Sequence, residues 1–160
     1  MQQPVSLLDT LVYLFDYLVY EKATPPSVDE LHAKLGEAGF PKADVERAMT
    51  WLLDLNDLQE SNVLQTPSHQ AVRQFTPAEA GKIAEDGRDC LRELVRLGVI
   101  DTRLREIIIH KLMTLEEIDI TADEIKWIAL MAVYNREGKE ASAIWLEQSL
   151  LEEADIPVVH

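Results

Sequence analysis

The sequence predicts a mainly α-helical protein in two parts, a winged-helix-like unit at residues 1–75 and a helical bundle at residues 76–160. Apolar residues recur at three- and four-residue intervals along most of the chain, which is the helical period. Glycine is scarce, with 6 in 160 residues. The first part also has the element order of a winged helix-turn-helix unit, in which three helices precede a short β-hairpin. We therefore expect this N-terminal unit to pack on the C-terminal bundle.

Four helix starts are marked by a hydroxyl residue followed three positions later by an acid. This spacing lets the two side chains satisfy free backbone amides of the first turn. The pairs are Ser6 with Asp9, Ser27 with Glu30, Thr76 with Glu79, and Thr121 with Glu124. Two helix ends are marked by glycines that favour the left-handed conformation, Gly39 and Gly98.

These signals predict seven helices and one short hairpin. The helices are expected at residues 6–22, 28–38, 42–58, 77–97, 102–115, 122–135 and 139–153, the fifth with Asp101 as its cap. Between the third and fourth helices the helical period is lost. Residues 63–66 and 72–75 are β-prone there and flank a Pro-Ser-His-Gln turn, which predicts a short hairpin.

The charge balance limits the kinds of partner that the protein can attract. The formal net charge is −14, from 15 basic and 29 acidic residues. Such a field repels nucleic acid and anionic membranes at long range. Residues 82–111 are nearly neutral, so the acidic surplus lies in the rest of the chain. The single cysteine, Cys90, excludes an intrachain disulfide and fits a reducing compartment.

The apolar run at residues 7–20 is interpreted as a core helix. A spanning helix needs about 20 apolar residues, whereas this run is shorter and contains Asp9 and Asp16. The residues before it lack the cationic start of a secretory signal. We therefore expect a cytoplasmic protein that does not contact a membrane.

Three tyrosines lie beside the core face of this first helix. Stepping 100° per residue places Tyr13, Tyr17 and Tyr20 on one narrow stripe next to the leucines and valines. Tyrosine is enriched at protein interfaces, so the stripe is a candidate contact for a partner. The alternative is that helices of the second half cover it within the same chain. The sequence leaves both interpretations open.

A strip of arginines is the candidate contact for nucleic acid or an acidic partner. Its members are Arg88, Arg92 and Arg96, joined by Arg73 from the predicted hairpin. Spacing of four puts the first three on one face of a helix. Each of them also follows an acid by three residues, which favours a solvated face of local ion pairs. The predicted third helix is net negative, so it lacks the cations that read DNA.

No motif for catalysis, a metal or a cofactor stands out. The acids at residues 116–124 lack the glycine and the alternating positions of a calcium loop. The histidines show no metal-ligand spacing with one another or with Cys90. There is no phosphate loop and no serine nucleophile elbow. We expect no cofactor, no metal and no enzymatic activity, although a scattered site is not visible in sequence.

Six segments resemble the bacterial Smg family, small cytoplasmic proteins of unknown function. In chain order they are LVYLFDY, LGEAGFPKADVERAMTWLLDL, RQFTPAEA, RELVRLGVID, REIIIHKLM and DEIKWIALMAVYN. They extend over nearly the whole sequence. The resemblance implies a cytoplasmic bacterial protein and supplies no functional residues.

These observations favour a non-catalytic interaction or regulatory protein. Its acidic surface suits a basic protein partner, since complementary charge steers association. The alternative is a nucleic-acid-binding regulator that uses the arginine strip or the hairpin near Arg73.

Overall fold

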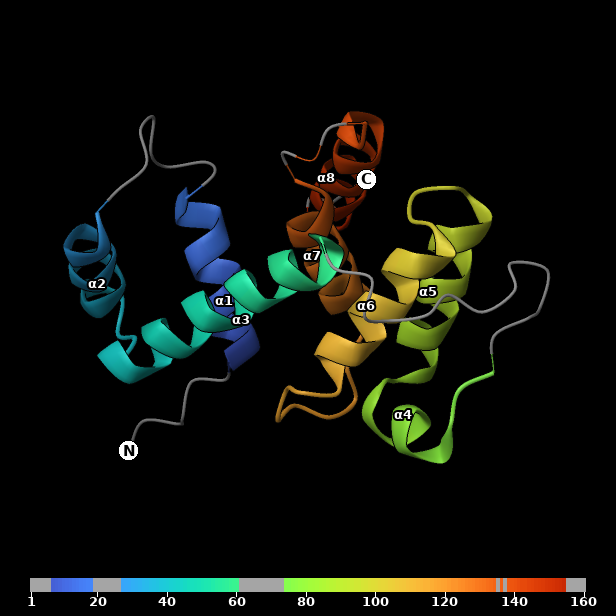
Figure 1. Ribbon diagram of the computed structural model, residues 1–160, viewed down its shortest axis with the longest axis horizontal. Coiled ribbons are helices and arrows are strands. Elements are labelled where there is room, and N and C mark those ends of the chain that lie inside the picture. Colours follow the sequence, from blue (N-terminus) through green and yellow to red (C-terminus); the bar gives the residue numbers. More distant parts are fainter. Residues whose placement is uncertain (1–6, 19–26, 61–73, 135, 137, 155–160) are drawn as a thin grey trace.

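The structure, a computed structural model, describes residues 7–18, 27–60, 74–134, 136 and 138–154 (Figure 1). This part of the chain forms eight helices. They are α1 Leu7–Asp16, α2 Val28–Glu37, α3 Lys42–Glu60, α4 Pro77–Lys82, α5 Glu85–Arg96, α6 Thr102–Leu112, α7 Ala122–Val133 and α8 Glu140–Ala154. The mainly helical prediction is confirmed.

The predicted β-hairpin is wrong, because the described residues form helices and no strand. Most of its two arms, residues 63–66 and 72–73, lies outside the described residues, and Gln74 and Phe75 precede α4 without strand structure. The ring of Phe75 instead packs against α5, with the Arg92 guanidinium 5.0 Å from its centroid. Short β-prone segments were a weak signal, because an isolated two-stranded hairpin is marginally stable in water. The N-terminal unit keeps its three helices and has no wing in the described residues.

Two helices, α2 and α3, pack against α1. Leu8, Leu11 and Leu14 of α1 are buried, and the helix lies mainly against α3, with α2 beside both (Figure 1). The α2 start is capped as predicted, since the Glu30 amide donates to Ser27 Oγ at 3.1 Å. Ser6, the cap predicted for α1, lies outside the described residues.

One hydrophobic core continues through both predicted parts of the chain. It includes Leu11 of α1, Leu55 of α3, Ile108 of α6 and Ile128 of α7. The 19-residue α3 crosses the molecule and contacts α6 and α7 as well as α1 and α2 (Figure 1). The boundary expected near residue 75 stays a prediction, because nothing shows whether either part folds alone.

The predicted helix at residues 77–97 is two helices. It breaks at Ile83 and Ala84, where the backbone is extended and pairs with Ile120. The Ala84 amide donates to the Ile120 carbonyl at 2.9 Å, and the Ile120 amide donates to the Lys82 carbonyl at 3.1 Å. The helical period continues across this break, so periodicity alone did not reveal it.

Because Gly87 has no side chain, α5 can lie close to the backbone of Ile120, which pairs with Ile83. A Cβ at Gly87 would lie 2.5 Å from the Ile120 carbonyl oxygen, far inside van der Waals contact. A glycine inside a helix often marks such a close approach. Gly87 therefore fixes the distance between α5 and the segment that leads into α7.

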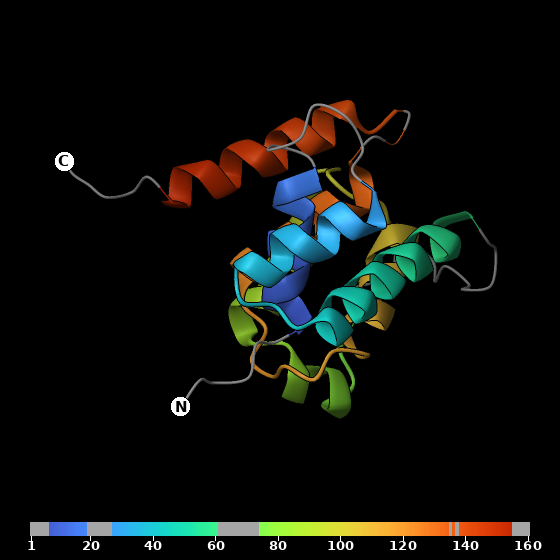
Figure 2. The same ribbon diagram turned by 90° about the vertical axis from the view of Figure 1, so that its left-hand side faces the viewer.

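The C-terminal helix α8 lies along α7 and projects beyond the rest of the molecule (Figure 2). Ala143 and Leu146 anchor it in the core, while Ile144 and Leu151 are exposed. The two other predicted capping boxes are confirmed, at Thr76 for α4 and at Thr121 for α7. None of the described helices has the length and apolarity that a membrane crossing requires.

Candidate functional site

A hollow of about 430 Å³ opens between α1, Phe40 and the first two turns of α7. We call it the acidic hollow. Its apolar side chains are Leu8, Val12, Tyr13, Phe40 and Trp127, and its acids are Asp9, Asp16, Asp123 and Glu124. Among the residues that line it in the described part of the chain, none is basic. A surface of this kind suits a ligand that is both cationic and partly apolar.

Five of the nine residues that line the hollow belong to α1. Asp9, Val12, Tyr13 and Asp16 are spaced at i, i+3, i+4 and i+7, which places them on one side of a helix. Two carboxylates thus stand on the same helix face as an aromatic ring.

Two aromatic contacts hold the other walls in place. The rings of Tyr13 and Phe40 lie 4.9 Å apart between centroids and are tilted by 48°. The Trp127 ring meets Phe15 edge to face, at 6.4 Å and 81°. Phe15 is buried in the core, so the core orients Trp127. The aromatic side chains of the hollow therefore come from α1, α7 and the connection between α2 and α3.

Helix electrostatics account for some of the acids in the hollow. Asp9, Asp123 and Glu124 lie in first turns, where the positive end of the helix dipole favours negative charge. The Glu124 carboxylate also accepts the Thr121 amide at 2.9 Å, as part of the capping box. Asp16 lies at the C-terminal end of α1, where the dipole disfavours an acid. Its position beside the hollow is not explained by the helix.

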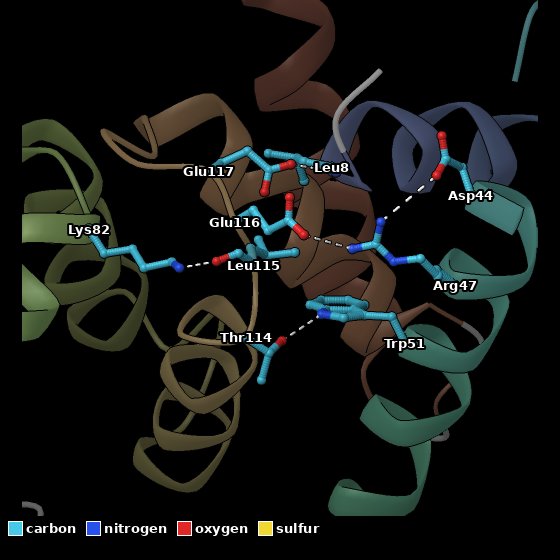
Figure 3. Close-up of polar contacts among 9 residues, drawn as sticks. All are labelled: Leu8, Asp44, Arg47, Trp51, Lys82, Thr114, Leu115, Glu116 and Glu117. Carbon is cyan, nitrogen blue, oxygen red and sulfur yellow. Dashed lines mark hydrogen bonds and ion pairs between the residues drawn. The ribbon is translucent and has the colours of Figure 1, made fainter. Parts of the chain in front are cut away.

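The connection between α6 and α7 leads into the helix that carries Asp123 and Trp127, and neighbouring helices hold it (Figure 3). It is held from α1 by the Leu8 amide, which donates to Glu117 Oε1 at 2.9 Å. It is held from α4 by the Lys82 ammonium, which donates to the Leu115 carbonyl. The start of α7 itself, with Asp123 in its first turn, is set by the capping box of Thr121 and Glu124.

Two side chains of α3 also hold this connection (Figure 3). The Trp51 indole N–H donates to Thr114 Oγ1 at 3.0 Å. Arg47 Nη2 donates to Glu116 Oε1 at 3.2 Å. Side chains or backbone groups of α1, α3 and α4 thus all hold the connection that leads into α7.

A second hollow, of about 620 Å³, lies on the α3 side. We call it the paired hollow. It is lined by Leu7, Ala43, Glu46, Arg47, Thr50, Trp51, Asp54, Lys111 and Thr114. Here two bases accompany two acids.

Lys111 is the centre of the paired hollow. Its side chain is 2% exposed, and its ammonium donates to Asp54 Oδ2 at 2.8 Å. The same ammonium lies 4.4 Å from the centroid of the Trp51 ring, within reach of a cation–π attraction. The positive charge of this hollow is thus balanced inside the chain, which is typical of a structural ion pair.

The tyrosines of the predicted stripe differ in their surroundings. Tyr13 is half-buried in the acidic hollow. Tyr17 is buried at 5% exposure, and the Lys34 ammonium of α2 lies 5.9 Å from its ring centroid. Tyr20 lies outside the described residues. Of the described pair, only Tyr13 is placed to meet a partner, and a partner contact there stays a prediction.

The predicted arginine strip is engaged in local contacts. Arg88 Nε donates to the Ile83 carbonyl at 3.1 Å, and Arg92 Nη1 donates to Asp89 at 3.1 Å. Arg96 Nε donates to Glu93 at 2.9 Å, and this hydrogen bond lowers the pKa of the Glu93 carboxyl from its ordinary value. Arg73 lies outside the described residues.

Potential metal-ligating side chains do not cluster in the described part of the chain. Within the ranges that the structure describes, no group of three or more His, Cys, Asp or Glu residues is placed to hold a metal ion. Cys90 is buried, and its thiol lies 3.7 Å from the Ala122 carbonyl. Burial among apolar neighbours is typical of a structural thiol.

Sequence reasoning found Tyr13 but missed the hollow around it. The spacing of Asp9, Val12, Tyr13 and Asp16 was a usable signal for one shared helix face. No local pattern could place Phe40 and Trp127 beside that face, because they come from separate elements that only the fold brings together.

Comparisons with known proteins agree with the sequence segments described above. Residues 7–160 match the family described as "Protein of unknown function (DUF494)". A "Protein Smg homolog" of Thioalkalivibrio sulfidiphilus is 35% identical over 148 residues, which cover 92% of this chain and 94% of the relative. A "Protein Smg homolog" of Idiomarina loihiensis is 36% identical over 156 residues, which cover 95% and 99%. The chain belongs to the Smg family.

The Smg resemblance is thereby confirmed. The description of the Smg family gives no function. No solved structure matches this chain. The role of this Smg-family protein must therefore be argued from its own site.

Proposed function

We propose that this Smg-family protein is a non-catalytic interaction protein that binds a basic protein partner through the acidic hollow. One observation carries the proposal: aromatic side chains and four carboxylates line one hollow whose described lining holds no basic residue. Aromatic faces and carboxylates both attract cations. Tyrosine and tryptophan are also enriched at protein interfaces.

The charge of the whole chain supports a basic partner. A net charge of −14 attracts a basic protein at long range and speeds its encounter with the acidic hollow. Salt screens such attraction over about 10 Å at 0.1 M. The complex should therefore weaken as salt rises.

Protein is favoured over nucleic acid as the partner. Arg88, Arg92 and Arg96 each contact a carbonyl or carboxylate of their own chain, so a phosphate would compete with those contacts. The net negative field also opposes the approach of nucleic acid.

Site-specific photo-crosslinking in living cells tests the proposal. A benzoyl-phenylalanine in place of Val12 would report on the acidic hollow, and the same group in place of Thr50 would report on the paired hollow. We expect a basic protein to be crosslinked from position 12 and not from position 50. The crosslink should be lost when Asp9 and Asp123 are changed to Asn. Crosslinks at both positions alike, or crosslinks to nucleic acid, would contradict the proposal.

A further inference from the structure

We infer that the acidic hollow recognises an arginine side chain of the partner in preference to lysine. This inference rests on the proposed function, because it names the group that enters the same hollow. The acids alone would not identify a ligand, since first-turn acids are common. The inference comes from the combination of acids with aromatic rings that packing contacts hold in place.

The carboxylates approach the hollow from two helices. Asp9 and Asp16 come from α1, and Asp123 comes from α7. A guanidinium has five N–H donors in one plane, so it can bond carboxylates that stand on different sides of it. An ammonium is a compact point charge and lacks this fixed, planar set of donors.

The aromatic side chains fit a flat cation. Tyr13, Phe40 and Trp127 line the hollow, and the contacts of Tyr13 with Phe40 and of Trp127 with Phe15 fix their rings. A guanidinium stacks on aromatic faces and sheds its hydration more readily than an ammonium. The cost of leaving water is therefore smaller for arginine than for lysine.

The size and rigidity of the hollow agree with one side chain of a docked segment. A volume of about 430 Å³ falls within the range of sites that bury small ligands. The ring contacts of Tyr13 and Trp127 and the capping hydrogen bond on Glu124 hold three of its lining side chains before any partner arrives. A site whose rings are already held in place favours a planar ligand of fixed geometry, because less ordering is needed on binding.

Calorimetric titration of the full chain with defined peptides tests the inference. The probes are three blocked Gly-Gly-Xaa-Gly-Gly peptides in which Xaa is arginine, lysine or citrulline, the neutral analogue of arginine. We expect the arginine peptide to bind about 5- to 10-fold more tightly than the lysine peptide, because of the planar donor set. The citrulline peptide should show no binding at the same concentration.

A charge-matched pair of variants locates the binding. The double variant Asp9→Asn with Asp123→Asn should weaken the arginine peptide about tenfold or more, since charge-assisted hydrogen bonds are lost. The control is Glu46→Gln with Glu93→Gln, which changes the net charge equally away from the acidic hollow. The control should bind as the unchanged protein does, and circular dichroism should show both variants folded.

The results would separate a failure of the arginine preference from a failure of the proposed function. Equal binding of arginine and lysine, lost in the Asp9 and Asp123 variant, would overturn the arginine preference and leave the basic partner in place. Absence of peptide binding, together with a basic protein crosslinked from position 12, would also overturn only this inference. Binding of citrulline as tight as that of arginine would overturn both, because the carboxylates would then contribute nothing.

Discussion

The acidic hollow and the paired hollow both open beside α1, yet they differ in how their charge is balanced. In the paired hollow the Lys111 ammonium is buried with Asp54 as its partner and Trp51 beneath it. The acidic hollow gathers four carboxylates with no base among its described lining residues. The difference separates a hollow whose lining mixes bases with acids from one whose described lining carries acids alone.

The contrast has a physical basis. A buried charge costs several kcal/mol unless a partner compensates it. Lys111 meets that condition within the chain. Carboxylates at a hollow that is open to water incur little of this cost. Of four predictions, ordered from the largest expected effect to the smallest, the second and third test this comparison directly.

The largest effect is expected where α5 meets the segment that leads into α7. Gly87→Ala would place a methyl group 2.5 Å from the Ile120 carbonyl oxygen and push α5 away from the segment that leads into α7. We expect a loss of about 3 kcal/mol in the free energy of unfolding, measured by urea denaturation, as for other overpacked sites.

Gly81→Ala is the matched control for that substitution. A Cβ at Gly81 in α4 would meet nothing within 4 Å. Replacing a helical glycine by alanine should therefore leave stability unchanged or raise it by up to about 1 kcal/mol. Equal losses at the two glycines would mean that the pairing at Ile120 does not constrain α5.

The second effect concerns the paired hollow. Asp54→Asn removes the carboxylate that balances the buried Lys111 ammonium, and Asp54 is itself partly exposed. We expect a loss of about 2 kcal/mol, below the 3 to 5 kcal/mol of a fully buried pair. Lys111→Met should cost less, because it removes the buried charge and keeps a long apolar side chain. A harmless Asp54→Asn would contradict the structural role given to this pair.

The third effect concerns the acidic hollow in the absence of a partner. Asp9→Asn and Asp123→Asn should each change the free energy of unfolding by no more than about 1 kcal/mol, the size of a helix-dipole effect. Thermal unfolding checks this. Losses as large as that of Asp54→Asn would show that the acidic hollow is also structural, and the contrast between the hollows would fail.

The smallest effect is expected at the exposed pair of Glu93 and Arg96. The hydrogen bond from Arg96 lowers the pKa of Glu93, so the pair stabilises the fold above the pKa that Glu93 has in the unfolded chain. That contribution disappears as pH falls through the lowered pKa of the folded state. In Arg96→Gln, an NMR titration should show the Glu93 pKa return toward its ordinary value. An unchanged pKa would mean that the pair does not form in solution.

The helices were largely predictable because their signals are local. Thr76 and Thr121 with their acids gave the starts of α4 and α7, and Gly39 and Gly98 gave two ends. The break at Ile83 was missed, because it depends on pairing with Ile120, 37 positions further along the chain.

The candidate site was predictable only in part, for the same reason. Tyr13 was singled out from its position on α1 and lines the acidic hollow. Tyr17, one helical turn further on, is buried beside α2, which stepping along a single helix could not show. The arginine strip was interpreted correctly as locally paired at Arg92 and Arg96. Phe40 and Trp127 join the site through tertiary packing alone.

One NMR titration compares peptide binding at the two hollows directly. The indole N–H of Trp127 reports on the acidic hollow, and that of Trp51 reports on the paired hollow. Titration of the ¹⁵N-labelled protein with the arginine peptide should shift the Trp127 resonance progressively and leave that of Trp51 in place. A shift of Trp51 without Trp127, or equal shifts of both, would contradict the claim that the acidic hollow is the binding site.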